Sequence, residues 1–226
     1  RFAVALSSKS LELLHPVFVR EYDARSGRPV RQWSIREEDP PPVFSVDADM
    51  FSPDARHLAA CESDGGDSAK LVVNVRDVAT ASLLASVRTE GENVEILQCA
   101  RPVAWFWGRP RLLLGRGSET GYTYALDGLM VLDVASQETR DLKLERVGED
   151  RVITHVSVSC DDRMLAVSFE SALRVFDADS GGLMHTLVER DTGGYQAFSP
   201  GHRHLLAAVV RNARARFVAV VFDAST

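Results

Sequence analysis

The chain has 226 residues, of which 45% are apolar and 26% are charged, and its formal net charge is −6. This balance excludes intrinsic disorder as the main state, and it excludes collagen-like or other low-complexity architectures. The longest apolar runs, Leu205–Val210 and Phe217–Phe222, have six residues, whereas a membrane-spanning helix needs about 20. A net acidic composition is also unusual for a protein that grips nucleic acid.

The three cysteines, Cys61, Cys99 and Cys160, are widely spaced. They form neither a Cys-x-x-Cys zinc signature nor a dense disulfide framework. We therefore expect a reducing setting that is intracellular and cytoplasmic. The chain begins with Arg and no signal peptide precedes it, so we expect it to be a piece of something longer.

Five apolar segments rich in Val, Leu and Phe each end in an aspartate. The aspartates are separated by 54, 56, 44 and 46 residues, and after four of them a turn leads into another strand-like stretch. This pattern is typical of β-strands separated by turns. The segments are Val17–Asp23, Val72–Asp77, Leu129–Asp133, Leu173–Asp177 and Val218–Asp223.

A second repeated element places turn residues between two apolar strands. Proline presets φ in such a turn, and Asp and Gly tolerate its other positions, so each copy predicts a tight hairpin. The copies are Phe51–Ala59, Val158–Ala166, Phe198–Ala207 and a degenerate one at Trp105–Leu114.

Each unit then contains a meander of four strands, and long helical periodicity is absent. In the fourth unit the predicted strands are Arg151–Ser159, Met164–Ser168, Ala172–Asp177 and Leu183–Val188. Four antiparallel strands repeated at this spacing indicate an all-β protein of the β-propeller class.

The sequence resembles the WD40 and WD40-like propeller family. The resemblance rests on the turns Phe51–Asp54 and Phe198–Gly201 and on the ends of the third strands, where WD40 blades have Trp-Asp. The Gly-His dipeptide of that family is missing before the first strands, and His155 stands near its place without the glycine. We therefore expect the buried His–Ser–Trp–Asp network of regular blades to be absent. The Asp-x-x-x-Gly spacing is also similar to YVTN-type and quinoprotein propellers. The third-strand dipeptides are Tyr22-Asp23, Arg76-Asp77, Leu132-Asp133, Phe176-Asp177 and Phe222-Asp223.

The resemblance implies a single propeller, or part of one, over residues 1–226, with about five four-stranded blades. Their expected bounds are 1–39, 40–90, 91–147, 148–190 and 191–226. The first unit begins at its second strand, Phe2–Leu6, and the last stops in its third strand at Asp223. We expect both of these blades to be incomplete, and the missing strands to come from the rest of a longer chain or from a partner.

No set of nucleophile, base and metal ligands stands out, so we expect no catalytic residue, no metal and no cofactor. His202 and His204 have the spacing of two ligands but lack a third. The glycine-rich stretch 115–121 lacks the Lys-Ser/Thr of a phosphate loop and is expected to be a long hairpin loop. The acidic pairs Asp47/Asp49 and Asp161/Asp162 are interpreted as strand-end and turn residues.

The repeated aspartates are too regular for catalysis. We expect them to accept hydrogen bonds from backbone amides of the turn that follows each third strand. These structural residues are Asp23, Asp77, Asp133, Asp177 and Asp223. We also expect Trp105 to pack between blades and Trp107 to be exposed at a turn.

Function is therefore sought on the loops, which a propeller displays at its faces. Three connections between second and third strands are unusual: the acidic Glu62–Lys70, the long Arg116–Asp127 and the basic Arg211–Arg216. Arg and Tyr commonly anchor protein interfaces. The predicted partner-binding residues are Arg116, Tyr122, Tyr124, Arg211, Arg214 and Arg216.

The leading hypothesis is a non-catalytic protein–protein interaction scaffold, which is what the resemblance implies, with other proteins or domains of the same polypeptide as partners. An alternative is a propeller enzyme of the lactonase or quinoprotein kind, with His155, Asp47 and Asp161 at the central channel. A second alternative is a propeller that binds nucleic acid through the loop Arg211–Arg216, with salt-dependent affinity. The sequence does not decide the partner.

Overall fold

The structure is a computed structural model, and it describes residues 2–6, 18–22, 26, 28–34, 50–63, 71–88, 97–120, 123–145, 152–170, 172–189, 192–199, 205–211 and 217–224. These residues form strands joined by turns, and no helix occurs among them. The expected all-β class is therefore confirmed.

The first two sheets are antiparallel meanders in chain order. Each of their strands pairs with the next strand along the chain. The first sheet has β1 (Phe2–Leu6), β2 (Phe18–Tyr22) and β3 (Pro29–Ser34), and the second has β4 (Met50–Phe51), β5 (His57–Ser63), β6 (Leu71–Asp77) and β7 (Leu83–Arg88).

The next eight strands are two such meanders joined into one sheet. Only one residue pair, Leu126 with Ile153, links them through β10 and β12. The first meander has β8 (Leu97–Trp105), β9 (Arg111–Thr120), β10 (Thr123–Asp133) and β11 (Thr139–Leu142), and the second has β12 (Ile153–Val158), β13 (Met164–Phe169), β14 (Ala172–Asp177) and β15 (Leu183–Glu189).

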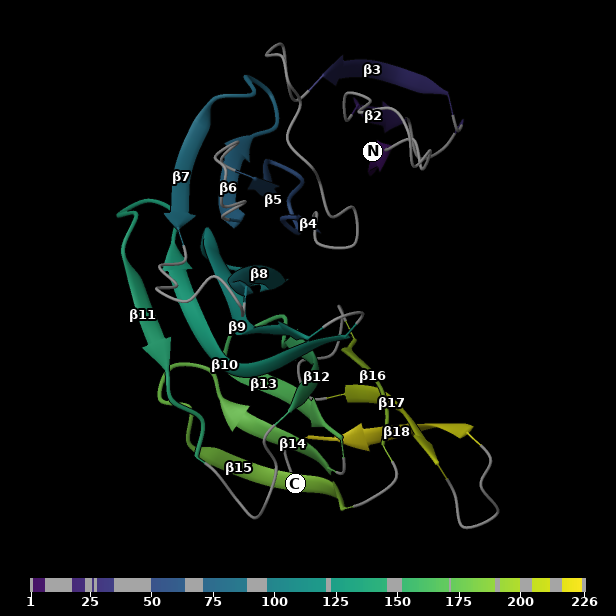
Figure 1. The fold of residues 1–226 in the computed structure, drawn as a ribbon. Helices are drawn as coiled ribbons and strands as arrows, with labels where there is room; N and C mark the ends of the chain where they lie inside the picture. Colours follow the sequence, from purple (N-terminus) through teal and green to yellow (C-terminus); the bar gives the residue numbers. More distant parts are fainter. Residues whose placement is uncertain are drawn as a thin grey trace.

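The last sheet of the described part of the chain has three strands. The five meanders follow one another around an arc, with β4, β8, β12 and β16 toward its inside and β7, β11 and β15 toward its outside (Figure 1). We call these five meanders blades one to five. The strands of blade five are β16 (Thr192–Phe198), β17 (Leu205–Arg211) and β18 (Phe217–Asp223).

The middle strands of blades three and four are buried on both sides because each of these two blades packs between two others. On β9, Leu112 and Leu114 pack against blade two, whereas Leu113 between them packs toward blade four. Successive side chains of a strand point to opposite faces, so a continuous apolar run fits a strand that is covered on both faces. Trp105 is buried in the cluster between blades two and three, as expected.

The predicted loop over 116–127 is wrong, because most of it is strand. β9 continues to Thr120 and β10 begins at Thr123, and these two residues pair with each other. The glycines mislead the sequence argument. A Cβ at Gly115 would lie 2.5 Å from a Leu126 methyl and 2.9 Å from a Val103 methyl. Glycine here permits close packing in a strand.

Alternating strand direction puts the connections on two different faces. The turns between the first and second strands and between the third and fourth strands lie on one face, which we call the turn face. The described ends of the second strands and the starts of the third strands, between which the partner loops were predicted, lie on the opposite face. Among the described residues of blades two to four, the turn face consists of 52–56, 78–82, 106–110, 134–138, 159–163 and 178–182.

Candidate functional site

The turn that joins β4 to β5 is fixed by its own side chains. The Ser52 hydroxyl donates to Asp54 Oδ1 at 2.6 Å and accepts from the His57 amide at 2.9 Å. The Arg56 amide donates to the same Asp54 oxygen at 3.1 Å. Burial raises the pKa of Asp54, but these two hydrogen bonds and the nearby cationic groups outweigh it and leave the pKa below its usual value. The carboxylate therefore stays ionised at neutral pH.

The turn that joins β12 to β13 repeats this arrangement in blade four. The Ser159 hydroxyl donates to Asp161 Oδ1 at 2.7 Å, and the Arg163 amide donates to it at 3.3 Å. The next residue, Asp162, has φ of 62°, as Ala55 has φ of 57° at the equivalent place. Asp161, a candidate of the enzyme alternative, thus has the same local hydrogen bonds as Asp54 in a turn.

The aspartates that end the third strands accept turn amides. Asp77 Oδ1 accepts from the amides of Ala79 at 2.9 Å and Thr80 at 2.8 Å. Asp133 and Asp177 accept from the equivalent amides of their own turns. The amide and hydroxyl of Thr80 lower the pKa of Asp77, and the hydroxyl and amide of Ser180 lower that of Asp177. Asp223 ends β18, and Asp23 lies outside the described residues.

Asp162 reaches from blade four to the turn of blade three. Its carboxylate accepts the Trp107 amide at 2.5 Å and the Gly108 amide at 2.8 Å. A non-glycine residue at positive φ costs free energy and persists where the surroundings hold it. The two amides are such a constraint, so Asp162 fixes the backbone on which Trp107 is displayed.

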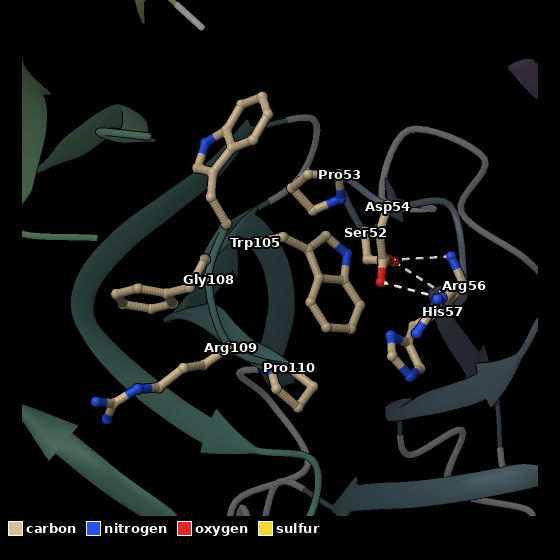
Figure 2. Close-up of a pocket in the computed structure, with 11 residues that line it drawn as sticks. Ser52, Pro53, Asp54, Arg56, His57, Trp105, Gly108, Arg109 and Pro110 are labelled. Carbon is tan, nitrogen blue, oxygen red and sulfur yellow. Dashed lines mark hydrogen bonds and ion pairs between the residues drawn. The ribbon is translucent and has the colours of Figure 1, made fainter. Parts of the chain in front are cut away.

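A hollow of about 200 Å³ lies between the turn-face residues of blades two and three. Figure 2 shows the Trp105 ring between Pro53, His57 and Pro110. The rings of His57 and Trp105 are stacked, with centroids 5.9 Å apart and an interplanar angle of 26°. The residues that line the hollow are Ser52, Pro53, Asp54, Arg56, His57, Trp105, Phe106, Trp107, Gly108, Arg109 and Pro110.

The rim of the hollow is aromatic and cationic. Trp107 is 44% exposed, as the sequence predicted for this turn. Arg56 forms a loose ion pair with Asp54, with Nε and Oδ2 3.7 Å apart. The Arg109 guanidinium forms no hydrogen bond or ion pair with any residue that the structure describes, and Figure 2 shows its side chain running away from Trp105.

A buried polar cluster joins blades four and five. The Gln196 side chain accepts from the Ser168 hydroxyl at 2.5 Å and donates to the carbonyls of His155 at 3.1 Å and Ala166 at 2.9 Å. Burial lowers the pKa of His155, although a backbone hydrogen bond with Gln196 raises it. His155 therefore lies in an inter-blade contact. His155 and Asp161, two candidates of the enzyme alternative, are separated along the chain. His155 is three strand residues, roughly 10 Å, from the end of β12, and Asp161 lies in the turn beyond that end.

The predicted partner residues are not brought to the hollow. Arg116 pairs with Asp141, with Nη1 and Oδ1 3.2 Å apart. Tyr124 lies on β10 opposite Glu119, and Arg211 ends β17 opposite Phe217.

Several residues of the sequence hypotheses lie outside the described residues. They are Asp47, Tyr122, His202, His204, Arg214 and Arg216. Within the described ranges, no group of three or more His, Cys, Asp or Glu side chains could hold a metal ion. No helix there is long and apolar enough to cross a membrane.

Sequence reasoning missed the hollow because two turns 54 residues apart in the sequence form it. Each turn was found, and Trp107 was expected at the surface, but their neighbourhood depends on how blades two and three pack. One signal was present: Trp107 and Arg109 are interface-type residues in a turn that departs from the Ser-Pro-Asp pattern.

Comparison with known proteins gives matches at the level of structure. A comparison with protein-family models gives no match, and a sequence comparison with curated proteins gives none either. The β-propeller domain of Swd1 (Cps50) from Myceliophteria thermophila has a TM-score of 0.59 at 15% identity, over 93% of this chain and 64% of that chain.

Two further solved structures are similar over nearly the whole chain. The uncharacterized protein lmo1340 from Listeria monocytogenes has a TM-score of 0.62 at 12% identity, over 98% of this chain and 60% of that one. KlAtg21, solved in a complex with the coiled-coil of AgAtg16, has a TM-score of 0.59 at 13% identity, over 98% of this chain and 63% of that chain. At these identities the likeness shows the fold, and this chain spans less than two thirds of each matched chain.

Proposed function

We propose that this chain, which has the WD40-like β-propeller fold, is a non-catalytic module that binds another protein through its turn face. The observation that carries the proposal is the exposed Trp107 on a turn that the carboxylate of Asp162 holds from the next blade. Tryptophan and arginine are the residue types that contribute most to protein interfaces. A preorganised backbone lowers the entropic cost of binding.

Other contacts between blades support the proposal because they link the turns of neighbouring blades. Arg111 and Arg140 of blade three both reach Asp179 of blade four, at 3.2 and 3.6 Å. The Gln137 side chain of blade three donates to the Leu84 carbonyl of blade two at 2.9 Å. The matched KlAtg21 propeller was solved with a coiled-coil partner, which is consistent with a binding role for this fold.

The test compares the tagged wild-type chain with Trp107→Ala in quantitative affinity purification from the source cells. Met184→Ala is the matched control, because Met184 is also 44% exposed but lies on β15 of blade four. We expect at least one protein to be retained by the wild type and the control and lost with Trp107→Ala. Equal recovery by all three chains, or recovery by none, would refute binding through the turn face.

A further inference from the structure

We infer that the hollow between blades two and three holds one apolar side chain of an extended peptide, and that Arg109 pairs with an acidic residue beside it on that peptide. The inference rests on the proposed function and specifies the chemistry of the partner. It is carried by three features of the described residues: the lining of the hollow, the charges at its rim and the rigidity of its two turns.

The part of the hollow that is lined by rings favours a single apolar side chain. The Trp105 ring is flanked by Pro53 and Pro110, and the His57 ring stacks on it. The volume of about 200 Å³ is below the roughly 300–1,000 Å³ that is typical of sites for whole small molecules or cofactors. A helix in a groove would need several anchor pockets along one line, whereas one hollow of this size suits one residue of an extended segment.

The rim charges favour a carboxylate next to that side chain. Arg56 and Arg109 contribute two guanidinium groups. Two carboxylates lie near them: Arg56 approaches that of Asp54, and the amides of Trp107 and Gly108 bind that of Asp162. Arg109 has no partner among the described residues, and it points away from Trp105. Its guanidinium is therefore placed to bind a peptide residue next to the one whose side chain enters the hollow. Arginine pairs with carboxylates through two parallel hydrogen bonds.

Both walls are held before any partner arrives. The Ser52 and Asp54 hydrogen bonds fix the turn of blade two, and Asp162 fixes the turn of blade three through two backbone amides. Binding then has to order the peptide and the exposed side chains of Trp107 and Arg109, but not the backbone of the two turns, which preserves more of the interaction free energy.

The test is a selection of random heptapeptides displayed on phage against the full chain. We expect enrichment of peptides in which an apolar residue lies within two positions of Asp or Glu. The best peptide and its counterpart with Asn or Gln in place of the acid are then compared by fluorescence anisotropy. We expect the acidic form to bind about tenfold more tightly to the wild type.

Substitutions then assign the two contacts. Arg109→Gln should abolish the difference between the acidic peptide and its amide counterpart, while both still bind. Trp107→Ala should weaken both peptides by at least tenfold, and Met184→Ala should change neither. Unchanged urea midpoints of the variants show that the fold is intact, because Trp107 and Arg109 are exposed.

The outcomes separate the inference from the proposed function. If selected peptides show no acidic preference, or if Arg109→Gln leaves that preference intact, the inference is overturned. If no peptide is selected but a protein is still lost from the purification with Trp107→Ala, the inference fails and the proposed function stands. If neither a peptide nor a protein binds, both fail.

Discussion

Gln196→Leu should destabilise the contact between blades four and five, because Gln196 is 4% exposed and its amide makes three hydrogen bonds. Each bond contributes about 1 kcal/mol, so their loss costs about 3 kcal/mol. The added apolar side chain returns about 1 kcal/mol through burial. The net loss of about 2 kcal/mol, with a urea slope of about 2–3 kcal/mol/M, lowers the unfolding midpoint by close to 1 M.

The assay is urea unfolding followed by tryptophan fluorescence, for Gln196→Leu, Ser168→Ala and the double variant. Because Ser168 donates directly to Gln196, the double variant should be about 1 kcal/mol less destabilised than the sum of the single variants. Thr154→Val is the control, since its hydroxyl makes one bond, to the Ser168 carbonyl at 3.2 Å. The reasoning is refuted if Gln196→Leu shifts the midpoint no more than this control, or if the single effects simply add.

Three further predictions concern the turns and the inner strands. Gly181→Ala should lower the free energy of unfolding in urea by more than about 2 kcal/mol, because Gly181 has φ of 75° and a Cβ there would overlap the Lys143 carbonyl oxygen. Gly182→Ala, with open space around its Cβ apart from one contact at 3.4 Å, should cost under about 1 kcal/mol. Asp162→Asn leaves one side-chain oxygen that can accept a hydrogen bond, because the other carboxylate oxygen becomes an NH2 group. At least one of the backbone amides of Trp107 and Gly108 should then exchange its hydrogen about tenfold faster, as measured by NMR. Burial favours neutral His155 and puts its folded pKa below 6.5. The contribution of neutral His155 to the free energy of unfolding is thus complete above pH 6.5 and is lost as the pH falls through the folded pKa. His155→Gln should therefore flatten the decline of the urea midpoint between pH 7.5 and 5.

The sequence predicted elements that local patterns determine. The strand expected at Ala172–Asp177 has those bounds, and Leu183–Val188 extends by one residue to Glu189. These strands end at turn residues whose chemistry is local, such as the aspartate that accepts the amides of its own turn. Apolar runs between such turns identify strands directly.

The parts that the sequence did not predict depend on neighbours that are distant in the chain. The glycines at 115 and 117 suggested a loop, yet Gly115 lies in a strand because Leu126 and Val103 pack over it. The contact of Asp162 with the amide of Trp107 crosses 55 residues, and no local pattern shows which acidic residue of a turn will cap another blade. The hollow depends on the same kind of long-range placement.

The single pairing of Leu126 with Ile153 makes blades three and four one continuous sheet. In repeat architectures stability is the sum of the stabilities of the units and of the coupling between adjacent units. Here one coupling includes a strand pairing in addition to packing, and the ion pair of Arg111 with Asp179 and two further hydrogen bonds accompany it. Blades three and four should therefore open together as one cooperative unit in hydrogen exchange, and the hollow lies at one boundary of that unit.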